Sequence, residues 1–452
     1  ISQAIGFALA NKLKNINNHI AVIIGDGALT GGVAFEGLNF TGHRDLPLII
    51  ILNDNEMSIG ENVGSVSRHF AELTLSKPYQ KLTDIYTNVM KKRRGIIKFF
   101  FWFAKNVERV LKLFLGYENI FLNLGFEYIG PLDGHNINQL INIFSKIKNN
   151  VHRPILIHVK TVKGKGYGRA ENNPSDFHGV TPYQMANGKS ELKDTKSFTD
   201  IFSDKIVKLS EQHNNIIGIT AAMEEGTGLK KFKERFPDKF FDVGIAEQHA
   251  VSMASTLAYS GLRPVFAVYS TFLQRAIDQV VQDICISSAP VIFAIDRAGI
   301  VGTDGETHQG QFDISFLRMI PNIMILAPSD STELELMLDY AYSLKTPVAI
   351  RYPRDIAVES QLDNKHPDIE TNPFVIVKEG VDVLIIVIGP FVTLAKEVIS
   401  TMEDKKLSCG ILYLRVLKPI DDEKIYTEIA KYKKVIVIEE NVFSGSVSQY
   451  IG

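Results

Sequence analysis

The chain has 452 residues, of which 45% are hydrophobic, and its formal net charge is -2 at pH 7. This length predicts two or three globular domains, and the near-neutral charge argues against a general nucleic-acid-binding surface. The two cysteines, Cys285 and Cys409, lack the spacing of a metal or redox motif, so a reducing cytoplasm is the simplest compartment.

The first predicted domain spans residues 1–180 and alternates short apolar runs with helical patterns. Apolar runs of this kind are typical of buried parallel strands, and the alternation predicts a doubly wound α/β sheet. The polar stretch at 181–196 has no apolar periodicity and predicts a linker. The predicted strands of this domain lie at 21–24, 46–52 and 155–160.

The second predicted domain spans residues 197–355 and continues the same alternation of strands and helices. Its expected strands lie at 216–220, 265–268, 291–295, 323–326 and 348–351, with helices such as 246–259 and 271–287 between them. A third α/β domain at 373–452 carries strands at 383–388 and 435–438 and is expected to be incomplete. The fold class is therefore α/β, with successive doubly wound parallel sheets.

The segment 91–115 combines four basic residues, Lys91 to Arg94, with a following apolar run. A helix lying on a membrane surface is one interpretation. Charged residues interrupt the segment at short intervals, and no run approaches the roughly 20 apolar residues that a bilayer requires. The amphipathic periodicity favours a partly buried or mobile helical insert, and we expect no membrane-spanning segment.

A Gly-Asp-Gly motif, Gly25 to Gly27, follows the first predicted strand, and Asn53-Asp54-Asn55 ends the next. Neighbouring parallel strands place their carboxyl ends side by side, and glycines let the backbone approach a phosphate closely. Asp26 and Asn55 offer the oxygen ligands that Mg2+ prefers, and the Met57 carbonyl is a further candidate. Gly-Asp-Gly alone is as typical of a tight turn as of a phosphate-binding site. The pair of motifs favours a metal–diphosphate site.

These two segments resemble the thiamine diphosphate signature, and their wording is similar to that of the 1-deoxy-D-xylulose-5-phosphate synthase family. Five further stretches match the family in its own order across nearly the whole chain: 128–135, 163–167, 241–249, 269–276 and 296–310. The resemblance implies domains of the transketolase type, with thiamine diphosphate and Mg2+ as cofactors.

The chain departs from the family pattern at its start. Family members carry a Gly-His segment just before the position of Ile1 and another histidine earlier, and both contribute to cofactor and substrate contacts. Ile1 also falls inside an amphipathic pattern, with Ile5, Ala8, Leu9 and Leu13 on one face and no capped start. We therefore expect the sequence to be truncated at both ends.

Glu247 is the candidate for the acid that the cofactor chemistry requires. It begins a predicted helix among Ile245, Ala246 and Val251, which would desolvate it and raise its pKa. A protonated glutamate can donate to the aminopyrimidine ring and so favour the reactive tautomer of the cofactor. Considered alone, a glutamate at this position more often interacts with the helix dipole.

The resemblance also implies further cofactor contacts. Phe272 would stack on the pyrimidine, although its position is equally typical of a core residue at the start of a helix. Lys163 and Lys165 lie in a glycine-rich loop where an ammonium could reach a phosphate, or simply remain solvated. The other implied cofactor contacts are Gly27, Ala28, Asn55 and Tyr167.

The predicted substrate residues follow strand ends and a glycine-rich loop. Arg297 and Arg351 could fork onto a sugar phosphate or form structural ion pairs. His308 could move protons near pH 7, although loop histidines are more often merely exposed. The resemblance places Arg275, Asp304 and the second catalytic candidate, His178, in the same cleft.

The activity that the resemblance implies is the decarboxylative condensation of pyruvate with glyceraldehyde 3-phosphate. The product, 1-deoxy-D-xylulose 5-phosphate, would supply isoprenoid and thiamine synthesis, and the family forms homodimers. Transketolase is the nearest enzymatic alternative, because it shares the cofactor site but releases no carbon dioxide. A catalytically incompetent, cofactor-binding fragment is the non-enzymatic alternative.

Overall fold

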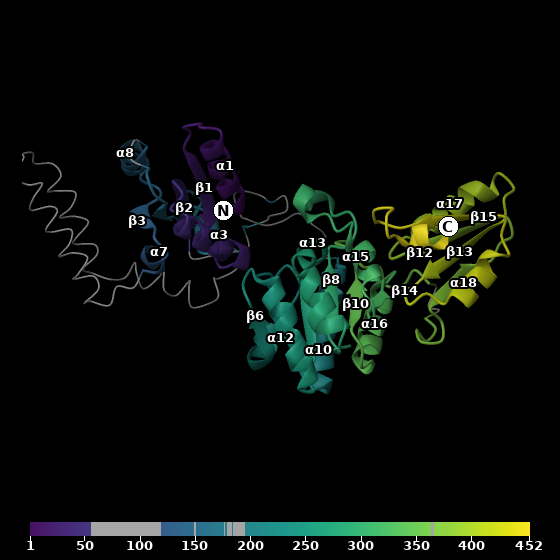
Figure 1. Cartoon of the computed structure of the whole chain (residues 1–452). Coiled ribbons are helices and arrows are strands. Elements are labelled where there is room, and N and C mark those ends of the chain that lie inside the picture. Colours follow the sequence, from purple (N-terminus) through teal and green to yellow (C-terminus); the bar gives the residue numbers. More distant parts are fainter. Residues whose placement is uncertain (56–118, 149–150, 176, 179–182, 184–194, 363–365) are drawn as a thin grey trace, which may run out of the picture. The chain divides into compact units, whose positions relative to one another are not determined.

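A computed structural model describes residues 1–55, 119–148, 151–175, 177–178, 183, 195–362 and 366–452 (Figure 1). The chain divides into two compact units, Ile1–Glu191 and Leu192–Gly452. The predicted insert at 91–115 and the predicted ligand Met57 lie outside the described residues. Most of the predicted linker also lies outside them, and the predicted domain limits stay predictions.

The first unit contains a four-stranded parallel sheet in the order β1-β2-β4-β3. Leu48, Ile50 and Leu52 pack on one face of this sheet, whereas Ile49 lies in the core of the other face, as the two-residue period of a strand requires. The strands are β1 (Ile20–Gly25), β2 (Leu48–Asp54), β3 (Glu127–Asp133) and β4 (Ile155–Lys160).

Helices cover both faces of this sheet, which confirms the doubly wound prediction. Residues of α1 (Ser2–Leu13), α3 (Gly32–His43) and α7 (Ile120–Asn123) share one core, and α8 (Ile137–Ile147) contributes to the other. The predicted apolar face of the first helix is partly wrong, because Leu13 is 84% exposed. Strand β3 was not predicted, since Gly130 and Pro131 interrupt its apolar pattern.

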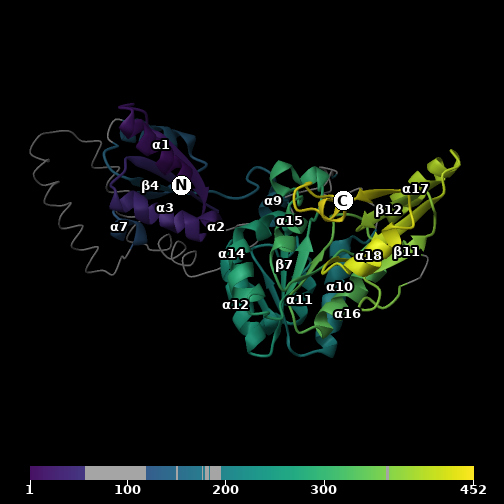
Figure 2. The same ribbon diagram turned by 45° about the vertical axis from the view of Figure 1, so that its right-hand side comes forward.

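The second unit is built on a seven-stranded sheet in the order β14-β9-β10-β8-β7-β5-β6, parallel except for β14. One face packs on α12 (Glu247–Tyr259), and the other packs on α10 (Phe198–Gln212) and α16 (Ser331–Ser343) (Figure 2). The strands are β5 (Ile216–Thr220), β6 (Phe240–Asp242), β7 (Arg263–Tyr269), β8 (Ile292–Asp296), β9 (Met324–Leu326), β10 (Val348–Arg351) and β14 (Val416–Lys418).

The continuous helix predicted at 271–287 is wrong. The structure divides this stretch into α13 (Ser270–Leu273), a 3-10 turn, α14 (Ile277–Gln279) and a π-helical segment, Val280–Cys285. Apolar periodicity does not distinguish these helix types, because the difference lies in which carbonyl each N–H reaches. The changes of helical pitch alter the directions of the side chains that this stretch carries.

A third sheet, in the order β11-β13-β12-β15, lies in the same unit and shares a core with the second. Leu384, Ile386 and Leu412 contribute to that shared core, while α17 (Val392–Glu403) covers the opposite face. The strands are β11 (Phe374–Lys378), β12 (Val383–Ile388), β13 (Cys409–Leu414) and β15 (Lys434–Ile438), and only β11 is antiparallel. The short helices α18 (Asp422–Ile429) and α19 (Val447–Ile451) contribute Ile425 and Val447 to the shared core.

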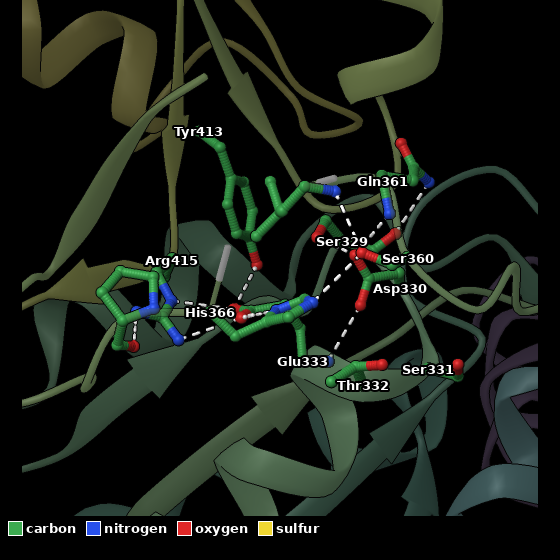
Figure 3. A network of polar contacts seen from close by, with 12 residues as sticks. Ser329, Asp330, Ser331, Thr332, Glu333, Ser360, Gln361, His366, Tyr413 and Arg415 are labelled. Atoms are coloured by element: carbon green, nitrogen blue, oxygen red, sulfur yellow. Dashed lines mark hydrogen bonds and ion pairs between the residues drawn. The ribbon is translucent and has the colours of Figure 1, made fainter. Parts of the chain in front are cut away.

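A buried polar network joins the second and third sheets (Figure 3). Arg415, which follows β13, donates from Nε and Nη2 to the two carboxylate oxygens of Glu333 on α16, at 2.8 and 3.0 Å. Both side chains are fully buried, and His366 Nδ1 lies 2.9 Å from Glu333 Oε1. A charge pair of this kind is costly to break, because the remaining partner would stay buried without its counter-charge.

Replacing Arg415 with methionine should therefore lower the free energy of unfolding of the second unit by about 3–5 kcal/mol. Urea unfolding monitored by circular dichroism measures this change. Lys378→Met is the matched control, because Lys378 forms a largely exposed pair with Glu403. Its unfolding midpoint should stay close to that of the unsubstituted protein. Equal midpoints for the two variants would contradict the role assigned to the network.

Candidate active site

Two buried carboxylates meet at the carboxyl edge of the first sheet. Asp26 directly follows β1 and is 3% exposed, and Asp54 ends β2 and is 2% exposed. The strands are paired so that Gly25 lies opposite Asn53, which confirms that these strand ends are neighbours. Burial, together with the charge and hydrogen bond of Asp54, raises the pKa of Asp26 to about 6. Two adjacent carboxylates of this kind suit a divalent cation.

A chain of hydrogen bonds through Tyr128 and His158 holds the Asp54 carboxylate in place. His158, buried on β4, places Nε2 2.7 Å from Asp54 Oδ2 and Nδ1 2.6 Å from the Tyr128 hydroxyl. Neither Tyr128 nor His158 was predicted as a site residue. The sequence does contain a sign of their role, because His158 follows the three apolar residues Ile155 to Ile157 in a predicted buried strand, and a buried imidazole requires polar partners.

This edge carries residues of the predicted metal–diphosphate site, whose assignment stays a prediction. A Cβ added at Gly25 would meet nothing within 4 Å, so the backbone beside Asp26 is open to an approaching group. Asn55 directly follows β2, as predicted. Among the described residues, no group of three or more His, Cys, Asp and Glu gathers around a potential metal position. The predicted ligand set instead combines the Asp26 carboxylate with an amide and a carbonyl oxygen, so its chemistry still suits Mg2+.

Lys163 interacts electrostatically with Asp26 at this edge, and His178 interacts with Lys163. Burial lowers the pKa of Lys163, while the charge of Asp26 acts in the opposite direction. Burial and the neighbouring Lys163 lower the pKa of His178. Tyr167 packs edge-on against Phe177, with ring centroids 5.6 Å apart. Lys165, by contrast, is largely exposed, and its Nζ lies 3.7 Å from Glu171 Oε2.

Glu247 is the first residue of α12 and is 3% exposed. Burial raises its pKa, although its backbone hydrogen bond and the charge of Arg275 oppose this shift. Arg275 Nη1 lies 2.8 Å from Glu247 Oε2, yet no hydrogen bond of good geometry reaches that oxygen from the described residues. The raised pKa agrees with the sequence-based expectation and favours a carboxyl group that can carry a proton.

An aromatic cluster brings together two of the predicted residues in the second unit. The ring of Phe272, on α13, is stacked on Tyr269, with ring centroids 5.4 Å apart. The imidazole of His308 lies edge-on to Phe272, with centroids 5.3 Å apart. Thr271 Oγ1 also donates to the Thr307 carbonyl, at 3.2 Å. The loop containing His308 is therefore held against the helix that carries Phe272.

Arg297 follows β8 in a left-handed backbone conformation, with φ of 57°, and its guanidinium lies 4.3 Å from the centre of the Tyr269 ring. Nη1 donates to the Gly226 carbonyl and to the hydroxyl of Thr199, and lies 2.9 Å from Asp296 Oδ2. Burial by itself would lower the pKa of Arg297, but the Asp296 carboxylate outweighs it and the pKa is raised.

The remaining predicted substrate residues also have partners within the chain. Arg297 Nε lies 3.7 Å from Asp304 Oδ2, and Arg354 contacts the other oxygen of Asp304. Arg351 is buried, and its Nε donates to Asp313 Oδ2 at 2.7 Å. The structural ion pairs considered as the alternative for both arginines are therefore present. Substrate binding by these residues stays a prediction.

The raised pKa of Glu247 leads to a prediction about stability. The pKa of Glu247 in the folded state lies above the ordinary glutamate value of 4.5. The protonated carboxyl group therefore favours the folded state below about pH 4.5, and this contribution to the free energy of unfolding is lost as the pH rises through the folded-state pKa. Glu247→Gln cannot ionise and should melt at a higher temperature than the unsubstituted protein at pH 7.5. Calorimetry should show this difference shrinking toward pH 4.5, whereas Glu234→Gln, on an exposed part of α11 (Lys230–Arg235), should show no such trend.

Family models match three successive parts of the chain. Residues 1–161 match the model described as 1-deoxy-D-xylulose-5-phosphate synthase. Residues 194–358 match the transketolase pyrimidine binding domain, and residues 374–451 match the transketolase C-terminal domain. A solved structure described as a split-gene transketolase, inactive beta4 tetramer, is 26% identical with a TM-score of 0.51, covering 57% of this chain and 84% of that one.

Curated relatives extend the similarity over the whole chain. A 1-deoxy-D-xylulose-5-phosphate synthase from Halothermothrix orenii is 47% identical, covering 100% of this chain and 71% of the relative. Another from Clostridium tetani is 44% identical, covering 100% of this chain and 73% of the relative. With the fold described above, these similarities confirm the predicted resemblance: the chain belongs to the 1-deoxy-D-xylulose-5-phosphate synthase family.

Proposed function

We propose that this chain catalyses the decarboxylative condensation of pyruvate with glyceraldehyde 3-phosphate to give 1-deoxy-D-xylulose 5-phosphate and carbon dioxide. The observation that carries the proposal is the buried carboxyl group of Glu247, whose pKa is raised, in a chain that belongs to this family. The product would supply isoprenoid and thiamine synthesis. The enzyme class is a transferase that uses thiamine diphosphate.

Thiamine diphosphate supplies, when bound, a nucleophilic carbon and an electron sink for the decarboxylation of a keto acid. Glu247 would hold a proton for the ring nitrogen of the aminopyrimidine, and Phe272 would stack on that ring. Asp26 and Asn55, with the Met57 carbonyl, would hold Mg2+ against the diphosphate. Gly27, Ala28 and Tyr167 complete the proposed cofactor contacts.

The substrate phosphate would interact with Arg297 and Arg351, because a guanidinium pairs well with phosphate oxygens. Structural partners already occupy donors on both side chains, so these contacts would add to existing ion pairs rather than replace them. His308 and His178 would move protons, and Arg275 and Asp304 would orient the substrates.

Assembly and location belong to the same proposal. A homodimer in the cytoplasm is what the family resemblance and the cysteine usage suggest, with no membrane or nucleic-acid partner. In the part of the chain that the structure describes, none of the helices combines the length and the apolarity that a membrane crossing requires.

Release of labelled carbon dioxide from carboxyl-labelled pyruvate tests the reaction directly. The purified protein with thiamine diphosphate and Mg2+ should release label in the presence of glyceraldehyde 3-phosphate, and the five-carbon product should appear with it. Transfer of a two-carbon ketol unit from a sugar phosphate without label release would favour the transketolase alternative. Cofactor binding without either reaction would favour a catalytically incompetent chain.

Two substitutions should separate cofactor binding from catalysis. Glu247→Ala should abolish carbon dioxide release, since the acid for the aminopyrimidine is lost, while Mg2+-dependent binding of thiamine diphosphate persists. Asp26→Ala should abolish that binding, because the carboxylate ligand is removed. Calorimetric titration of both variants measures the binding. Normal carbon dioxide release by Glu247→Ala would refute the proposed role of this residue.

A further inference from the structure

The loop at residues 298–310, here called the substrate loop, carries Asp304 and His308 and begins directly after Arg297. The base of the loop is closed by two backbone hydrogen bonds, in which Gly299 and Gly310 each donate to the other's carbonyl at 2.8 Å. The Ala298 N–H also donates to the Tyr352 carbonyl at 3.0 Å. The position of the loop base therefore determines where the predicted substrate residues lie.

The segment that follows the third sheet, residues 440–444, contacts the base of the substrate loop. Glu440 follows β15, and the Ile300 backbone N–H lies near enough to its carboxylate to influence the pKa of that group. The same carboxylate lies against Gly299, where an added Cβ would clash with it. Two residues further on, the Val442 N–H donates to the Gln311 carbonyl, at 3.0 Å. The C-terminal domain thus contacts the substrate loop at its base and just beyond it.

The same segment also holds the helix that follows the loop, α15 (Asp313–Met319). Ser315 Oγ donates to the Ser444 carbonyl at 2.6 Å and accepts from Asn441 Nδ2 at 2.8 Å. The first residue of α15, Asp313, forms the buried ion pair with Arg351. Residues 440–444 therefore contact both the loop with the predicted proton donor and the helix that holds a predicted phosphate ligand.

We propose that Glu440 is a positioning residue for the substrate site, because its carboxylate lies against the base of the substrate loop at Gly299, beside the Ile300 N–H. Its contribution to substrate binding rests on the proposed function, whereas its effect on the loop does not. Thr271 and Phe272 hold the part of the loop that carries His308, so a shift at the loop base should leave His308 in place and weaken substrate contacts both before and during reaction. The change should therefore appear mainly in KM. Glu440 itself is not expected to touch the substrate.

The neighbouring Glu439 provides a matched control. Its carboxylate accepts from the backbone N–H groups of Val447 and Ser448, at 3.2 and 2.7 Å, at the start of α19. Replacing Glu439 removes a carboxylate of the same segment without removing the carboxylate that lies against Gly299. Glu440→Gln is the conservative variant, because its amide oxygen retains an acceptor at the same position.

Hydrogen–deuterium exchange and steady-state kinetics of Glu440→Ala, Glu440→Gln and Glu439→Ala test the proposal. Glu440→Ala should exchange faster in peptides covering 298–311 and raise the KM for glyceraldehyde 3-phosphate about tenfold, with kcat changed less than about threefold. Glu440→Gln and Glu439→Ala should stay near the unsubstituted protein in both measurements. If Glu440→Ala folds poorly, Glu440→Met, which keeps the length of the side chain but lacks the carboxylate, should repeat its result.

Unchanged loop exchange in Glu440→Ala would overturn the proposal. A Glu440→Gln variant as impaired as Glu440→Ala, or a Glu439→Ala variant with the same rise in KM, would also overturn it, because the effect would then not depend on the Glu440 side chain at the base of the loop. If the unsubstituted protein released no carbon dioxide, the proposed function would fail, while the exchange measurement would still decide whether Glu440 holds the loop.

Discussion

Parallel strand pairing constrains every part of the candidate site. In the first unit, the pairing of β1 with β2 leaves Asp26 and Asp54 at one edge, where their carboxylates meet. In the second unit, Tyr269 on β7 is paired with Asp296 on β8, so the aromatic cluster and Arg297 lie at one edge of that sheet. Backbone hydrogen bonds satisfy the interior of each strand, and the irregular chain after a strand end is free to carry polar side chains.

The burial of carboxyl groups at these edges lowers the free energy of unfolding, but it also provides groups that can hold a proton or attract a cation. Burial raises the pKa of Asp26, Glu247 and Asp296, so each resists ionisation more than an exposed carboxyl would. Such groups are useful where a proton must be held or a cation attracted, and they require support from elsewhere in the fold. In the second unit, that support comes from apolar cores on both faces of the large sheet and from the fully buried pair of Arg415 and Glu333.

The third sheet is part of the same architecture rather than an appendage. It shares an apolar core with the second sheet, and the chain that leaves β13 continues into β14, which extends the second sheet by antiparallel pairing with β9. The Arg318 guanidinium of α15 lies 4.4 Å from the Tyr450 ring centre, so side chains of the C-terminal domain also flank this helix. Because α15 provides the carboxylate partner of Arg351, the docking of the third sheet bears directly on the predicted substrate side.

Local sequence determined the alternation of strands and helices, the Gly-Asp-Gly and Asn-Asp-Asn motifs at two strand ends and the position of Glu247 at the start of a helix. These features follow from the burial period of strands and from residue types at strand ends, which are local signals. Tertiary structure alone decided that His158 supports Asp54 from 104 positions away, that Asp313 pairs with Arg351, and that Glu440 contacts the substrate loop. Hydrogen bonds and ion pairs depend on distances of a few ångströms, and the spacing of residues along a chain does not specify such distances between segments that meet only on folding.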